Sequence, residues 1–179
     1  MRALLSMLAV ATSVACGLVR SYSVEPKTAA LSGWTDTIRP YNYVSEVITT
    51  NFDELDSVSG SYCELFGGSL GAGGPYHVSV RTYPGGAEIA SGSNTNPGDH
   101  KWIRFKLSVL YPESVIKGKQ LEFRFTRSNG DSLMYYYAEN AYDYGHIIIG
   151  GGQLQQPPGT APDLCMRVYA RLRPTTPGW

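Results

Sequence analysis

The chain has 179 residues, which suits one domain with short tails rather than a two-domain enzyme. Basic and acidic residues number 15 each, so the formal charge is zero, and no basic excess points to a nucleic-acid binder. Twenty glycines, 11 prolines and 13 tyrosines describe a chain rich in turns and strand formers, as is typical of an all-β fold.

The first 15 residues have the pattern of a signal peptide. Arg2 supplies a positive charge, residues 3–11 are apolar except for one serine, and the small residues ending at Ala15 suit a signal peptidase. A membrane-spanning helix needs about 20 apolar residues, and Arg20 arrives too early for one. We therefore expect an exported protein, located outside the cell, in the periplasm or at the cell surface.

Three cysteines have different expected roles. Cys16 follows Ser13-Val14-Ala15, which resembles the lipobox of bacterial lipoproteins but lacks its usual leucine, so lipidation and ordinary cleavage both fit. Cys63 and Cys165 remain after export, where either one disulfide or two buried thiols are compatible with their strand-like surroundings. No CxxC spacing indicates a zinc or redox site.

Hydrophobic periodicity divides the remaining chain into three parts. Residues 16–43 lack a sustained pattern and are interpreted as a linker or irregular N-terminal arm, while residues 174–179 form a C-terminal tail. Between them, residues 44–173 alternate in short runs that predict a β-sandwich domain. Strands are expected over residues 47–50, 62–66, 76–82, 87–90, 101–107, 121–126, 133–138, 146–149 and 164–172. Residues 91–98, rich in Gly, Ser and Asn, are expected to form a loop.

Eight or nine short strands with no long amphipathic helix predict an all-β, antiparallel β-sandwich. Four motifs follow one another along the chain and form the basis of a resemblance. They are Tyr-Cys-Glu-Leu-Phe at 62–66, residues 74–81 with the turn at 84–86, Trp-Ile-Arg-Phe at 102–105, and residues 163–169. Over residues 45–172 this set resembles exported bacterial sandwich modules of galactose-binding-like or jelly-roll type. The resemblance implies a non-catalytic jelly roll, with carbohydrate bound by some relatives. Such modules usually carry alanine where Cys165 stands, which favours a buried thiol there.

Enzymatic and metal sites are not expected. Residues 67–71 match the G-x-S-x-G pattern around Ser69, but that elbow needs a helix after the serine, and the Ala-Gly-Gly-Pro at 72–75 cannot begin one. The three histidines lack metal-ligand spacing. The acidic cluster at residues 53–56 could bind calcium through its carboxylates, but it lacks the further ligands of an EF-hand, so a solvated loop is the favoured interpretation. We therefore expect neither a catalytic residue nor a cofactor.

Five tyrosines lie within residues 135–144, beside acidic and amide side chains. Aromatic rings next to such groups suit sugars, which present flat C–H faces and many hydroxyls. Strand alternation turns Tyr136 away from its two neighbours, so packing of one face into the core is the alternative. The candidate ligand contacts are Tyr135, Tyr137, Asn140, Tyr142, Asp143, Tyr144 and Trp102.

These observations favour a non-catalytic exported binding module, for carbohydrate or for attachment to a cell-surface component. The alternative is a structural or assembly protein of the cell envelope with no small-molecule ligand. Neither nucleic acid nor a cofactor is an expected partner. Contact with a membrane is expected only through a lipid at Cys16.

Overall fold

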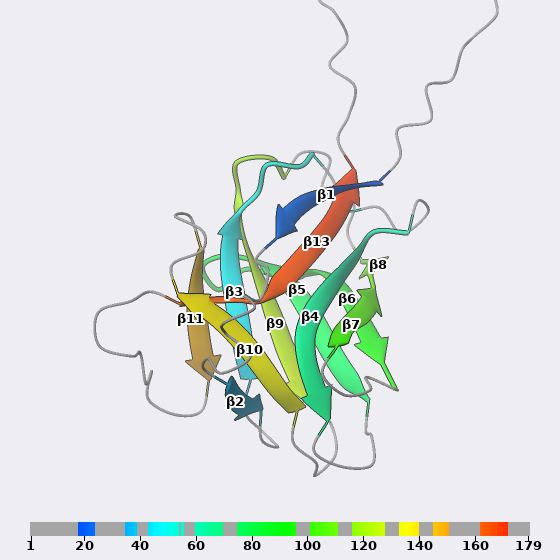
Figure 1. Cartoon of the computed structure of the whole chain (residues 1–179). Helices are drawn as coiled ribbons and strands as arrows, with labels where there is room; N and C mark the ends of the chain where they lie inside the picture. Colours follow the sequence, from blue (N-terminus) through cyan, green and yellow to red (C-terminus); the bar gives the residue numbers. More distant parts are fainter. Residues whose placement is uncertain are drawn as a thin grey trace, which may run out of the picture.

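The computed structural model describes residues 18–23, 35–38, 43–53, 55, 60–69, 75–95, 101–110, 116–127, 133–139, 145–150 and 162–171. These residues contain thirteen strands in two antiparallel sheets and no helix, so none of them forms a helix that could cross a membrane. Figure 1 shows the sheets as two layers, with β13, β4 and β10 in front of β3, β9 and β5. The predicted all-β, antiparallel and sandwich-like architecture is confirmed.

The six-stranded sheet has the order β11-β3-β9-β5-β6-β8. Its strands are β3 (Tyr43–Thr49), β5 (Tyr76–Thr82), β6 (Glu88–Asn94), β8 (Ser108–Val109), β9 (Gln120–Arg127) and β11 (Gly145–Gly150). Strand β5 has the predicted bounds and the predicted alternation, because Val78 and Val80 are buried while the residues between them are half-buried. Strict alternation of this kind marks a strand with one covered face.

The seven-stranded sheet has the order β1-β13-β4-β10-β12, with β2 also beside β10 and β7 beside β4. Its strands are β1 (Leu18–Ser23), β2 (Thr35–Ile38), β4 (Tyr62–Ser69), β7 (Lys101–Lys106), β10 (Leu133–Glu139), β12 (Pro162–Leu164) and β13 (Met166–Arg171). The inner faces of both sheets share one core, in which the rings of Phe105 and Phe125 meet with centroids 5.5 Å apart.

The N-terminal arm contributes two strands that the periodicity did not reveal. Strand β1 pairs with β13 and strand β2 pairs with β10, so these two parts of the expected linker or irregular arm are paired strands. Strand β2 has the sequence Thr-Asp-Thr-Ile, which is too short to establish alternation. Such strands are stabilised by backbone pairing with a neighbour, which the local sequence does not report.

Residues 91–94, expected in a loop, instead complete β6. Ser91 pairs with Ser79 and Ser93 pairs with His77 of β5. Gly92 is required between them, because a Cβ there would lie 2.5 Å from the carbonyl oxygen of Lys106. Polar residues suit this strand because its outer side faces solvent, and the segment therefore has the composition of a loop and the pairing of a strand.

The turn between β5 and β6 gives a stability prediction. The amide of Gly86 donates to the carbonyl of Thr82 at 2.8 Å, and a Cβ on Gly86 would overlap the Thr82 side chain and lie 2.6 Å from its carbonyl oxygen. Gly86→Ala should therefore lower the free energy of unfolding by about 1–3 kcal/mol in urea denaturation. Gly85→Asn is the control, since Gly85 has a φ of 64° that asparagine tolerates and open space around it. Equal stability of the two variants would contradict this account.

The closing segment, expected as one strand, is divided at Cys165. Its N–H donates to the Tyr136 carbonyl of β10 at 2.9 Å, and its carbonyl accepts from Phe66 of β4 at 2.8 Å. Cys165 thus stands where the chain passes from β10 to β4. Cys63 pairs with Val168, three residues beyond Cys165, so the rise along the strand and the spacing between strands place the two cysteine Cα atoms about 11 Å apart. A disulfide needs less than about 7 Å, and none joins them.

Burial makes Cys63 unreactive. The thiol is buried among apolar residues, and this burial raises its pKa, so the nucleophilic thiolate is disfavoured in the folded state. In a Cys16→Ser background, the two buried thiols of Cys63 and Cys165 should both resist Ellman's reagent until denaturant is added. Because only the unfolded chain ionises readily, Cys63 contributes full stability below about pH 8.5 and progressively less above it. A Cys63→Ala variant should lose this part of the alkaline destabilisation; rapid labelling of native Cys63 would contradict the prediction.

Candidate ligand-binding surfaces

The described part of the tyrosine segment lies mainly in the interior. Tyr135 is 2% exposed, and its backbone pairs with Gly67 of β4. Tyr135 is therefore a packing residue rather than a surface contact, and Tyr136 is only 4% exposed. The backbone of Tyr137 pairs with Leu164. The other predicted contacts of this segment, Asn140, Tyr142, Asp143 and Tyr144, lie outside the described residues, as does Cys16.

Trp102 lies on the outer face of the seven-stranded sheet, opposite in direction to Ile103 and Phe105, as its alternation predicts. The Phe66 ring bridges it to β10: its centroid is 5.3 Å from that of Trp102 and 5.2 Å from that of Tyr136, both edge-on. The structure therefore joins Trp102 to the tyrosine strand through Phe66.

Two arginines pack on aromatic rings of the same outer face. The Arg104 guanidinium carbon lies 4.2 Å from the centroid of Tyr62, whose ring also stacks on Tyr169 with centroids 4.3 Å apart. Arg167 lies 3.7 Å from the centroid of Trp102. We call this surface the aromatic–arginine face, made of Tyr62, Glu64, Phe66, Trp102, Arg104, Arg167 and Tyr169. Tyr62 is packed between Arg104 and Tyr169, so it is not a stacking platform for a sugar.

Glu64 anchors both arginines of the aromatic–arginine face. The residue is 5% exposed; its Oε1 accepts from Nε of Arg104 at 2.9 Å, and its Oε2 lies 3.7 Å from Nη1 of Arg167. Hydrogen bonding to Glu64 raises the pKa of Arg104, which keeps the guanidinium charged. Burial raises the pKa of Tyr62, so its phenol stays neutral at physiological pH. A buried carboxylate thus holds two cations at the surface.

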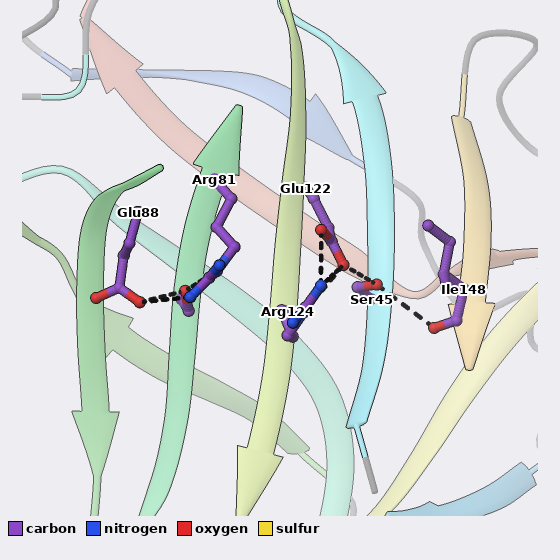
Figure 2. A network of polar contacts seen from close by, with 7 residues as sticks. Ser45, Arg81, Glu88, Glu122, Arg124 and Ile148 are labelled. Atoms are coloured by element: carbon purple, nitrogen blue, oxygen red, sulfur yellow. Dashed lines mark hydrogen bonds and ion pairs between the residues drawn. The ribbon is translucent and has the colours of Figure 1, made fainter. Parts of the chain in front are cut away.

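The outer face of the six-stranded sheet carries a second polar network, shown in Figure 2. At its centre, the buried Glu122 accepts hydrogen bonds from Ser45 Oγ at 2.8 Å and from Arg124 Nε and Nη2 at 3.0 Å each. The Arg124 guanidinium also lies 4.1 Å from the centroid of the Tyr43 ring. These contacts fix the long side chains in the middle of the face.

Towards β6, a smaller network positions Glu88. Its Oε2 accepts from Ser79 Oγ at 2.5 Å and lies 3.7 Å from Nη2 of Arg81, while Arg81 Nε donates to Ser79 Oγ at 3.1 Å (Figure 2). Charge-assisted hydrogen bonds of this kind order the side chains that they join. The Glu88 carboxylate is therefore held in one place on the surface.

A groove of about 690 Å³ lies beside Glu88, over β5, β6, β8, β9 and the end of β7, and we call it the hydroxyl groove. Five of its residues carry hydroxyls, and His77, Glu88 and Lys106 add ionisable groups. The groove is lined by His77, Val78, Ser79, Glu88, Ser91, Gly92, Ser93, Lys106, Ser108 and Thr126. The groove was not predicted because residues 91–94 have the composition of a loop; the alternation of Ser91 and Ser93 with Gly92 and Asn94 was the available signal.

The chemistry of the hydroxyl groove suits a ligand with many hydroxyls. Serine and threonine hydroxyls both donate and accept, a carboxylate accepts, and an ammonium donates. The described residues contain no group of three His, Cys, Asp or Glu side chains that could hold a metal ion. Of the acidic cluster at 53–56, residues 54 and 56 lie outside the described part of the chain. Ser69 is the last residue of β4, and residues 70–74 after it also lie outside that part.

Comparison with known proteins adds no relative to this picture. No protein-family model matches the sequence, and a search of curated proteins found no significant match. A functional argument for this chain therefore rests on the chemistry of its two outer faces.

Proposed function

We propose that the protein is an exported, non-catalytic binding module of jelly-roll type that holds a carbohydrate in the hydroxyl groove. The observation that carries the proposal is the concave, hydroxyl-lined surface of about 690 Å³ on one sheet. Ligand sites in proteins usually measure about 300–1,000 Å³ and bring a few polar groups together. This groove has both properties.

Hydrogen bonding supports a sugar as the ligand. Each sugar hydroxyl both donates and accepts, so it can pair with Ser91, Ser93 or Ser108 in either direction. Glu88 adds an acceptor, which Ser79 and Arg81 already hold in place. An acceptor that is ordered before binding reduces the entropy lost when the ligand arrives.

Two predictions from the sequence support the same proposal. The signal-peptide pattern would place the module where glycans are abundant, and its ordered motifs resemble galactose-binding-like modules. Tyr137, Asn140, Tyr142, Asp143 and Tyr144 remain predicted contacts of a separate surface, because Tyr137 belongs to β10 of the other sheet. Lipidation of Cys16 remains a predicted means of surface attachment.

A glycan array with the purified protein tests the proposal. Ser91→Phe should fill the groove and weaken binding of a retained glycan by at least about 10-fold. Thr49→Phe is the matched control, because Thr49 is a half-buried outer residue of β3 that does not line the groove. Thermal unfolding of both variants shows whether the fold is kept.

The outcomes separate the alternatives. Binding to no polysaccharide, or binding equally indifferent to Ser91→Phe and Thr49→Phe, would refute the groove as a sugar site. Loss of binding in Tyr142→Ala and Tyr144→Ala would add the tyrosine segment to the site. Oligomers in sedimentation, without any glycan binding, would favour an assembly protein of the envelope.

A further inference from the structure

Positive charge is concentrated on the outer face of the seven-stranded sheet. Strand register places two rows of side chains next to each other, Arg104-Glu64-Arg167 and Lys106-Tyr62-Tyr169-Arg20. The two rows therefore contain four cations and one carboxylate, although the formal charge of the whole chain is zero. The excess of positive over negative charge is therefore a local property of this face.

Arg104 is the best-defined cation of the two rows. Its side chain is 61% exposed, although Nε and Nη2 both engage Glu64 Oε1 at 2.9 Å and the guanidinium lies over the Tyr62 ring. A guanidinium carries five N–H donors, so an exposed head group held in this way keeps donors for a ligand. Arg104 is thus both oriented and accessible.

The arrangement suits an anion better than a neutral sugar. Glu64 is buried beneath the arginines, so an approaching ligand meets the cations before it meets the carboxylate. Tyr62 has one face against Arg104 and stacks on Tyr169, which leaves no ring face for a sugar. Planar guanidinium groups instead pair with carboxylates through two parallel hydrogen bonds.

We infer that the aromatic–arginine face, together with Lys106 and Arg20, is a second binding site and that its ligand is a carboxylate-bearing polysaccharide. The two rows cross β7, β4, β13 and β1, which at about 4.8 Å between strands span about 14 Å. A polyuronate repeats a carboxylate along its chain and can contact several cations in one row. The site lies on the other sheet from most of the hydroxyl groove, although Lys106 at its edge also lines that groove.

Binding of the purified protein to polygalacturonate tests the inference, with fully methyl-esterified polygalacturonate as the uncharged probe. The acid form should bind, the ester should not, and affinity should fall as salt rises from about 50 to about 200 mM. Arg104→Gln combined with Arg167→Gln should lower affinity by at least about 10-fold. Lys117→Gln removes one charge from an exposed turn outside both rows and should have no effect.

Further measurements can contradict the proposed polyuronate site. Equal binding to the ester, or no loss with both arginines replaced, would overturn it. Binding to vesicles of anionic lipid that needs both arginines, without binding to polygalacturonate, would also overturn it. If the double variant fails to fold, Arg104→Lys keeps the charge but loses the planar fork and should still weaken binding. Ser91→Phe should bind polygalacturonate normally, which separates this site from the proposed groove.

Discussion

Replacing Phe125 by alanine should lower the free energy of unfolding by about 3–5 kcal/mol. The side chain is fully buried in β9, with Val44 of β3 and Val78 of β5 directly opposite it. Its ring also meets Phe105 across the core, with centroids 5.5 Å apart. Alanine would leave a cavity at the place where the two sheets are packed together, and urea denaturation of both proteins measures the loss.

Two controls separate packing from a general effect of substitution. Phe125→Leu keeps most of the apolar volume and should cost about 1–1.5 kcal/mol. Leu110→Ala removes a large apolar side chain that is 51% exposed, and it should change stability by less than about 0.5 kcal/mol. A small effect of Phe125→Ala, similar to that of Leu110→Ala, would mean that the core does not depend on this contact.

The fold was predictable where one face of a strand is covered. Strand β5 follows its expected bounds, because burial of Val78 and Val80 imposes strict alternation on the sequence. Strand β2 and the second half of β6 were missed for the opposite reason. The serines of β6 face outwards, and β2 has only four residues, so neither segment shows alternation. Pairing with β5 and β10 makes them strands.

The candidate surfaces were less predictable than the fold. Alternation placed Trp102 on the outer face, but its contact with Arg167 depends on the register of β7, β4 and β13. Register follows from pairing between distant segments, which a short sequence window does not contain. The hydroxyl groove could not be predicted for the same reason. Ser91 and Ser93 line it together with His77 and Ser79 only because β6 pairs with β5.

A second large loss of stability, about 3–5 kcal/mol, is expected from Glu46→Ala. Glu46 is fully buried and lies on the core side of β3, opposite Phe123 of β9 and Ile147 of β11. Its Oε2 accepts from the backbone N–H of Leu164 in β12 at 2.8 Å, which links the two sheets through the core. Alanine would leave a cavity and a buried N–H without this acceptor, and both cost stability.

Glu46→Gln identifies which part of the effect is polar. Glutamine has nearly the same volume and keeps a side-chain oxygen that can accept from Leu164, so it should cost less than alanine. Hydrogen exchange provides a local measurement, because β12 leads into Cys165 and from there into β13. In Glu46→Ala the amides of Leu164 and Cys165 should exchange faster than those of β5. The reason is that this segment, where the chain passes from β10 to β4, loses its hydrogen bond to β3. Equal losses of stability in the two variants, with uniform exchange, would show that volume and not the hydrogen bond holds this junction.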